Sequence, residues 1–495
     1  MQHTADMTSS PLDRGPAPPL AQLRYTPQKR WSASRFNART LSDDGRMLLW
    51  NTLTGAVSEF LPAHRDGVLA LLSEGAREPL EGLAAHMAKR GFLVPAGLDE
   101  LARFRMLFGQ QQWRSDVLQM ILLASEDCNF RCVYCYEKFN HGTMLPEVRQ
   151  GVRRLVEERA PRLRELSANW FGGEPLYGWE AIEELAPFFR ATADRYGLGF
   201  TSHMTTNGYL LDEDRATRLL EWGCTKYQIT IDGMPAEHDC KRVGRDGSGT
   251  WQVIMDNLRA MKQRRAQFTI TVRVNFDRDN YLKLGPFLEQ LSEDFAGDPR
   301  YQLRFRQVGK WGGPNDDALD TCGVAEHRYV LDELRGRAIG LGLNPEGGIH
   351  GISTPGSQVC YAGRPYHFIV GATGKLMKCT VVLDELPENV VGRITPEGKL
   401  EVNDAHLLKW VAPLFETDQL CQSCYVLPGC QGAACPVTRI THGERTCCSV
   451  KSNLKREMRF NLDAIRRARE AVLAQRAAEA AAAPAPAPEP VAAGG

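Results

Sequence analysis

The chain lacks a long apolar stretch, and it lacks an excess of either charge. No window reaches the roughly 18 apolar residues that a membrane span needs. The opening residues, MQHTADMTSSPLDRGPAPPL, lack the basic and then apolar segments of a secretory signal. Lysine plus arginine equals aspartate plus glutamate, 60 against 60, and neither sign forms a long block. We therefore predict a cytoplasmic protein without a membrane or nucleic-acid partner.

Cysteine, in contrast, is plentiful in a chain for which a reducing compartment is predicted. The chain has 14 cysteines. Three of them form a C-x3-C-x2-C run in DCNFRCVYCYEKF, at Cys128, Cys132 and Cys135. A structural zinc site takes four protein ligands and a redox pair takes two. Three thiolates suit an iron–sulfur cube whose remaining iron is open to a small molecule; a zinc knuckle completed by a distant ligand is the alternative.

A chain of 495 residues exceeds the usual size of one hydrophobic core, so several domains are expected. The pattern predicts a disordered N-terminus at 1–33, a small hairpin-plus-helices module at 34–108, a strand–helix alternation at 109–312, a bridging segment at 313–346, a loop-rich cysteine region at 347–454, a helix at 455–476 and a disordered Ala/Pro tail at 477–495.

The alternating region contains six candidate strands, at 117–125, 166–173, 200–208, 226–233, 268–276 and 301–309. Alternation at this length predicts an α/β fold, a partial (β/α)6 TIM-like barrel flanked by the small N-terminal α+β module and the loop-rich C-terminal domain. Reactive groups in such barrels gather where the strands end. The chemically suggestive residues fall there: the cysteine loop, Gly172-Gly173-Glu174-Pro175, Thr206-Asn207, Asp232 and Asn275.

These motifs, in this order, resemble the radical S-adenosylmethionine (SAM) superfamily. The resemblance implies that Cys128, Cys132 and Cys135 hold a 4Fe-4S cluster that chelates and reductively cleaves SAM, and that the 5′-deoxyadenosyl radical then abstracts a hydrogen atom from the substrate. It also implies a SAM-binding set, with Glu174 at the SAM amino group: Gly172, Gly173, Glu174, Pro175, Thr206, Asn207, Asp232 and Asn275. His238, Asp239 and Arg242 match a further family stretch. No catalytic side chain is assigned.

A second set of cysteines follows at Cys360, Cys379, Cys421, Cys424, Cys430, Cys435, Cys447 and Cys448. Taken alone, C-x2-C pairs suggest zinc ribbons. The arrangement resembles the SPASM extension of radical SAM enzymes, which implies two auxiliary 4Fe-4S clusters and three clusters in all. By that resemblance Cys360, Cys379 and Cys435 serve the first, and Cys421, Cys424, Cys430 and one of Cys447 and Cys448 serve the second.

The first auxiliary set is short of one thiolate. Relatives often carry a further cysteine where this chain has Thr354. Either a distant group such as Cys322 or a non-cysteine ligand completes the set, or one iron is open.

SPASM proteins mostly act on peptides or proteins. Sulfatase maturases carry an aspartate base directly after the cysteine that matches Cys379, where this chain has Thr380. We therefore hypothesise a maturase that installs a thioether or carbon–carbon crosslink in a ribosomally made precursor peptide, with an electron donor such as flavodoxin or ferredoxin. The N-terminal hairpin either captures the peptide by strand addition or only braces the barrel. The alternatives are formylglycine formation on a protein, a small-molecule substrate, or a non-catalytic zinc-stabilised binding protein.

Overall fold

The computed structural model of the chain describes residues 29–42, 44–346, 360–383, 386–432, 435–448 and 451–460. The predicted tail, most of the predicted N-terminus and Thr354 lie outside these ranges. So does most of the predicted final helix, although the chain is already helical from 451 to 460. No helix of the described residues is long and apolar enough to cross a membrane.

All six predicted barrel strands are present and parallel, and each pairs with its neighbour in the chain. They are β7 (Val117–Ser125), β9 (Glu165–Gly172), β10 (Gly199–Thr206), β11 (Cys224–Thr230), β13 (Thr269–Phe276) and β14 (Tyr301–Gln307). The large, mainly parallel sheet is that of a partial TIM-like barrel, as the alternation predicted.

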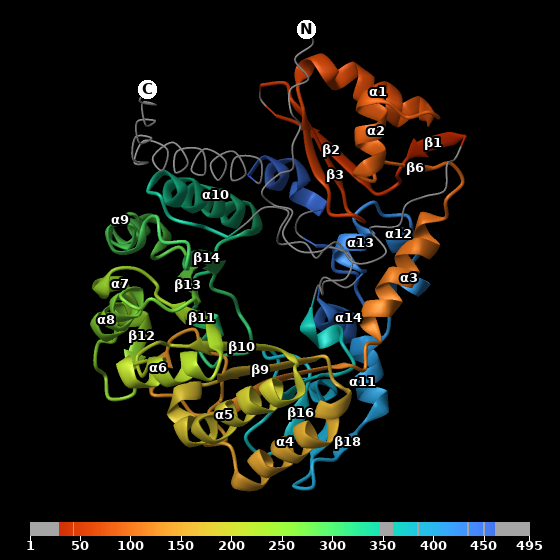
Figure 1. Ribbon diagram of the computed structural model, residues 1–495. Helices are drawn as coiled ribbons and strands as arrows, with labels where there is room; N and C mark the ends of the chain where they lie inside the picture. The colour runs from red at the N-terminus through yellow and green to blue at the C-terminus, as the bar shows by residue number, and fades with distance from the viewer. Residues whose placement is uncertain are drawn as a thin grey trace, which may run out of the picture.

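Helices cover the outer face of this sheet, as Figure 1 shows. They are α4 (Pro146–Arg159), α5 (Trp179–Tyr196), α6 (Glu213–Glu221), α8 (Trp251–Lys262), α9 (Leu284–Phe295) and α10 (Val324–Gly340). Alternate residues of the strands are fully buried in the core that these helices share; Met120, Trp170 and Val272 are examples. The other residues of each strand therefore face the inside of the barrel.

A short antiparallel ribbon lies at the rim. It consists of β8 (Phe130–Cys132), inside the cysteine loop, and β12 (Arg242–Gly244), which follows α7 (Pro235–Lys241).

The C-terminal cysteine region continues the barrel sheet. Its strands are β15 (His367–Val370), β16 (Lys375–Met377), β17 (Val390–Ile394) and β18 (Leu400–Val402), and its helices are α11 (Asp404–Val411), α12 (Gln419–Gln422), α13 (Leu427–Cys430) and α14 (Pro436–His442). Strand β15 is completely buried and pairs in parallel with β7. The sequence showed little apolar periodicity here because these strands are short. The region gains its core from the barrel.

The N-terminal module packs on the C-terminal cysteine region. It contains β1 (Arg30–Ala33), β2 (Asn37–Leu41), β3 (Met47–Asn51), β4 (Val57–Phe60), β5 (Ala76–Arg77), β6 (Leu93–Pro95), α1 (Arg65–Glu74), α2 (Gly82–Lys89) and α3 (Glu100–Gln112). The predicted hairpin is β3–β4. One face of β3 contributes Leu48 and Trp50 to a cluster with Val426 and Met458. Figure 1 shows the module directly above α12 and α13.

Candidate functional site

The loop that carries Cys128, Cys132 and Cys135 leaves the end of β7 and is held as half of the β8–β12 ribbon. Cys132 is paired with Arg242 in this ribbon. The amide of Val133 donates to the carbonyl of Lys241 at 2.9 Å, and the amide of Cys135 donates to the carbonyl of Cys132 at 3.1 Å. The loop is thus anchored along its length.

The three thiols share a small, mostly buried space. Cys128 is buried, while Cys132 and Cys135 are half-buried. Burial raises the pKa of Cys128 and of Cys132, and it raises the pKa of Cys135 to about 12. The thiols are also close enough to raise one another's pKa. Metal ligation would release these protons, because the ligand is the thiolate.

The Gly172-Gly173 pair allows the loop after β9 to lie against the cysteine loop. A Cβ atom on Gly172, whose φ is +123°, would stand 2.0 Å from the carbonyl oxygen of Ser125. A Cβ atom on Gly173 would stand 2.7 Å from the carbonyl oxygen of Asp127. The amides of Gly173 and Glu174 instead donate to these two carbonyls at 3.1 and 3.0 Å. Only glycine fits this close approach.

Glu174 is fully buried and joins the ends of β9 and β10. Its carboxylate accepts hydrogen bonds from the hydroxyl of Thr206 at 2.7 Å, the amide of Asn207 at 2.7 Å and the amide of Leu176 at 3.0 Å. Burial raises its pKa, and these three donors oppose that rise. The side-chain amide of Asn207 reaches the cysteine loop, where it donates to the side-chain oxygen of Asn129 at 2.8 Å.

Asp232 and Asn275 meet the cysteine loop at the hydroxyl of Tyr134. Tyr134 donates to the Asp232 carboxylate, and the side-chain amide of Asn275 donates to the Tyr134 oxygen at 3.1 Å. Arg242 donates to the same oxygen at 3.0 Å. Burial lowers the pKa of Arg242, but Tyr134, Cys132 and Asp232 more than compensate, so this buried guanidinium stays charged. This network was not anticipated from the sequence, because Tyr134 is an ordinary aromatic residue in the motif.

His238 and Asp239 brace the loop after β11. The His238 ring accepts from the amide of Asp232 at 3.2 Å and pairs with the hydroxyl of Thr250 at 3.1 Å. Asp239 accepts from the amides of Thr250 and Trp251 at 2.8 and 2.9 Å. Asp239 therefore caps α8, and neither side chain is aimed at the thiols.

Cys360, Cys379 and Cys435 are brought together from three separate segments. Burial raises the pKa of Cys360, and the nearby thiols of Cys379 and Cys435 raise it further. Burial also raises the pKa of Cys379, and Cys435 adds to this rise. The residue after Cys379, Thr380, shares a hydrogen bond of 2.7 Å with the hydroxyl of Tyr361. Cys322 has different surroundings. Burial raises its pKa, and the charged groups near enough to shift it further are Glu326, Arg278, Asp277 and Asp320.

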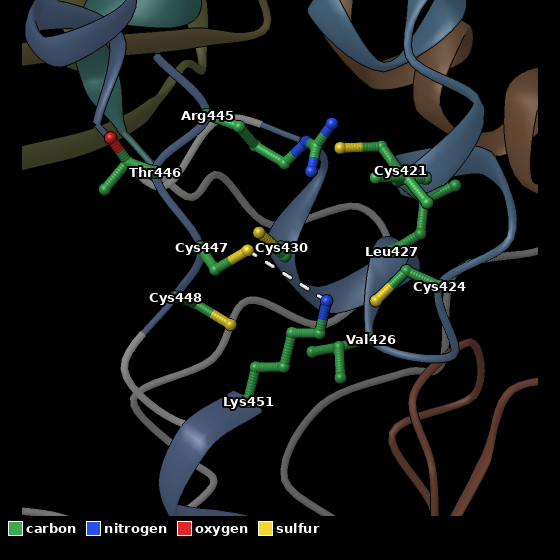
Figure 2. A pocket seen from close by; sticks show the side chains of 12 residues that line it. Cys421, Cys424, Val426, Leu427, Cys430, Arg445, Thr446, Cys447, Cys448 and Lys451 are labelled. Atoms are coloured by element: carbon green, nitrogen blue, oxygen red, sulfur yellow. Dashed lines mark hydrogen bonds between the residues drawn. The ribbon is translucent and has the colours of Figure 1, made fainter.

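The other five cysteines of the second set line one pocket. Figure 2 shows the thiols of Cys424, Cys430, Cys447 and Cys448 around the amine of Lys451, and the thiol of Cys421 beside the guanidinium of Arg445. Cys448 is half-buried and forms a sulfur hydrogen bond with Cys430, which lowers the pKa of Cys448. Cys447 is exposed, and its sulfur lies 4.0 Å from the Lys451 amine. In the part of the chain that the structure describes, no three His, Cys, Asp or Glu side chains converge as a single metal ion would require.

Comparisons with known proteins agree with this architecture. Residues 122–283 match the Radical SAM superfamily. The serine-type anaerobic sulfatase-maturating enzyme of Klebsiella aerogenes is 24% identical over 338 residues, which cover 65% of this chain and 80% of the relative. The GTP 3′,8-cyclase of Microcystis aeruginosa is 29% identical over 293 residues, which cover 53% of this chain and 80% of the relative.

A solved structure described as "Native anSMEcpe with bound AdoMet and Cp18Cys peptide" superposes with a TM-score of 0.51 at 18% identity. The match covers 72% of this chain and 99% of that one. At this identity the likeness establishes the fold. The superfamily match identifies residues 122–283 as a radical SAM domain, a fold that binds SAM and a 4Fe-4S cluster.

Proposed function

We propose that the chain is a peptide maturase that forms a thioether or carbon–carbon crosslink in a ribosomally made precursor peptide. The observation that carries the proposal is the identity of the residue directly after Cys379, which is Thr380. Thr380 has no carboxylate, and its hydroxyl is bonded to Tyr361. A reaction that needs an aspartate base at this position therefore lacks it, whereas crosslinking does not require that base.

The SAM-cleaving site is assigned to the rim of the barrel. Cys128, Cys132 and Cys135 hold the 4Fe-4S cluster there. When bound and reduced, this cluster supplies the electron that cleaves SAM and yields the radical that abstracts a hydrogen atom from the substrate. The SAM-facing residues are the ring of strand ends: Gly172, Gly173, Glu174, Pro175, Thr206, Asn207, Asp232 and Asn275. Glu174 already accepts three protein hydrogen bonds, so at most one lone pair remains for the SAM ammonium. Its main role is to fix the two loops against each other.

Two auxiliary 4Fe-4S clusters are assigned to the C-terminal region. Cys360, Cys379 and Cys435 serve the first. Cys421, Cys424, Cys430 and Cys448 serve the second, since Cys448 contacts Cys430 and Cys447 is exposed beside Lys451. The surroundings of Cys322 favour a non-cysteine group as the fourth ligand of the first auxiliary cluster.

The partners are a precursor peptide and a flavodoxin or ferredoxin. In the described residues β2 pairs only with β3, so its outer edge is a candidate for strand addition by the peptide. Strands β2 and β3 also pack against the C-terminal cysteine region, which would bring a bound peptide to the side of the molecule that holds the auxiliary thiols.

Replacement of Cys128, Cys132 and Cys135 by alanine tests the SAM-cleaving site. We expect anaerobically reconstituted variant protein to make no 5′-deoxyadenosine, because no thiolate remains to hold the cluster. The matched control is Cys224→Ala, which removes a buried thiol of β11 that lies in none of the assigned sites. Persistent 5′-deoxyadenosine formation in the triple variant would refute the assignment.

Iron and sulfide analysis tests the auxiliary clusters and the zinc-protein alternative. Three cubes predict about 12 irons per chain, and downstream zinc sites predict about 4. A colourless protein that retains zinc and no iron would support a non-catalytic binding protein.

Formylglycine formation is the second candidate, because a serine-type sulfatase-maturating enzyme is 24% identical to this chain. The two reactions leave different products. A peptide with an adjacent Cys and acceptor residue would become crosslinked, with loss of hydrogen and without a carbonyl. A sulfatase-type peptide would gain an aldehyde that reacts with a hydrazide probe. An aldehyde product would replace the crosslinking proposal, and turnover of a nucleotide such as GTP would replace both.

A further inference from the structure

The inner face of the barrel carries an unusual set of arginines on β13 and β14. In the register of these two strands Arg273 is paired with Arg304, and Asn275 is paired with Arg306. The residues between them, such as Val272, Val274 and Phe305, are buried in the core under the helices. Because side chains alternate along a strand, the three arginines share the opposite face, inside the barrel.

Two of these arginines, Arg273 and Arg304, stand directly opposite each other, whereas Arg306 stands opposite Asn275 and is exposed to solvent. Like charges that stand directly opposite each other on neighbouring strands destabilise the sheet. Arg304 is neutralised by Glu346, whose carboxylate oxygens lie 2.5 and 2.9 Å from its guanidinium nitrogens. Arg273 donates one hydrogen bond, to the side-chain oxygen of Asn275 at 2.8 Å. Among the described residues Arg306 has neither a hydrogen-bond partner nor an ion-pair partner.

The surroundings add positive charge. Lost hydration lowers the pKa of Arg306, and so do the nearby charges of Arg304, Arg273 and Arg335. The carboxylate of Glu346 opposes this effect. The ring of His327 also lies near Arg306, and its buried Nδ1 atom has no hydrogen-bond partner in the described chain. Within the ranges that the structure describes, two arginines without a carboxylate partner thus lie among further cations.

The arginines lie next to the place where the radical is released. Asn275, two residues beyond Arg273, contacts Tyr134 of the cysteine loop. Burial raises the pKa of Tyr136 in that loop, and Glu137 raises it further. Arg273 and Tyr361 are also close enough to Tyr136 to shift this pKa. Tyr361 directly follows Cys360. Arg273 is therefore near the loop that carries the SAM-cleaving thiols, and Tyr136 of this loop is also near the residue that follows Cys360.

We propose that Arg273 and Arg306 form a carboxylate-binding subsite that holds an acidic residue of the substrate peptide close to the residue that is modified. This inference rests on the proposed function, since it specifies the kind of peptide. A guanidinium and a carboxylate form strong paired hydrogen bonds, and the site offers two guanidinium groups that no carboxylate of the described residues pairs with. The carboxylate of SAM has the same chemistry and is the other possible occupant.

Calorimetric titration separates these two sources. The titrated protein is anaerobically reconstituted, SAM-saturated enzyme, and the probes are two synthetic peptides with one Cys that differ only in Asp or Asn two residues away. We expect the Asp peptide to bind about tenfold more tightly than the Asn peptide, as one charge-assisted pair would give. Arg306→Gln and Arg273→Gln should reduce this ratio to near one, and Arg306→Lys should retain part of it.

The controls are chosen to keep each outcome distinct. Arg190→Gln, in an exposed pair with Asp194 on α5, should leave the ratio unchanged. A separate SAM titration should give a Kd within about twofold of wild type for both variants. Equal binding of the two peptides by wild type, or no binding, overturns the inference, and so does a loss of SAM affinity in the variants. Formation of 5′-deoxyadenosine by wild type is measured alongside, because its absence would contradict the proposed function rather than the carboxylate-binding subsite.

Discussion

At the scale of single residues, the space between the two rim loops is set by glycine. The loops after β7 and β9 are joined by backbone hydrogen bonds that leave no room for a Cβ atom at Gly172. The sequence identified this glycine by its motif. Its physical reason, a carbonyl oxygen 2.0 Å from the would-be Cβ atom, depends on a residue 47 positions away, Ser125.

Gly172→Ala is therefore expected to separate the loops. The added methyl group would clash with the Ser125 carbonyl and would sit at a backbone angle that costs about 1–3 kcal/mol for a non-glycine residue. We expect a lower midpoint of thermal unfolding and loss of 5′-deoxyadenosine formation. Gly197→Ala is the control, because Gly197 also has a positive φ, +64°, but an added methyl group there would meet nothing within 4 Å. Equal effects at the two glycines would contradict this explanation.

His203, on the inner face of β10, should make stability depend on pH. Burial, and then Arg304 and Lys226, lower its pKa to about 4, so it is neutral in the folded chain. An unfolded histidine titrates near 6.5, and the unfolded state therefore binds the additional proton as pH falls from 6.5 towards 4. The stability that neutral His203 contributes is present above pH 6.5 and is lost below it.

His203→Gln should remove this dependence. Between pH 7 and pH 4.5 the free energy of unfolding of wild type should fall by roughly 2 kcal/mol more than that of the variant. Urea unfolding at the two pH values measures the difference. Identical pH slopes for the two proteins would show that folding does not lower the pKa of His203.

At the scale of elements, the β8–β12 ribbon was beyond sequence reasoning. Each strand has three residues, too few for a period to show, and they lie about a hundred residues apart in the chain. The ribbon is held by the buried ion pair of Lys241, which directly precedes β12, and Asp277, which follows β13. Their side chains are only 11% and 9% exposed. The sequence, in contrast, predicted the six barrel strands, because each is a long apolar alternation.

The substitution Asp277→Asn should leave the buried charge of Lys241 without its ion-pair partner. Removal of one partner of a buried pair typically costs about 3–5 kcal/mol, because the other charge stays unpaired. We expect the variant to retain less iron at Cys132, since β12 is no longer fixed. Adding Lys241→Met to Asp277→Asn should restore most of the stability and iron, as measured by urea unfolding and iron analysis. No recovery in the double variant would mean that Asp277 acts through its backbone contacts rather than through Lys241.

At the scale of the whole molecule, the first and the last modules depend on each other. Leu48 and Trp50 on one face of β3 pack against Val426 and Met458, whereas Leu49 on the other face packs inside the N-terminal module. Cys424, Cys430 and Cys448 border the first of these clusters. The module thus packs behind the pocket that Cys421, Cys424, Cys430, Cys447 and Cys448 line, called here the second cysteine pocket.

Leu48→Ala and Leu49→Ala form a matched pair, because both side chains are fully buried. Each should cost about 2–5 kcal/mol of stability. Only Leu48→Ala should also lower the iron content, by about 4 per chain, with 5′-deoxyadenosine formation retained. Iron analysis of both reconstituted variants checks this expectation. Equal iron contents would show that the module does not support the second cysteine pocket.

The sequence by itself determined the order of the barrel strands, the cysteine loop and the position of each motif at a strand end, because periodicity and short motifs are local properties of the chain. Only the tertiary structure decided which side chains meet: Tyr134 with Asp232, Arg273 opposite Arg304, Cys435 beside Cys360 and Cys379, and Leu48 against Val426. These contacts join residues far apart in sequence, and they depend on strand register and on the packing of whole modules, which no local pattern encodes.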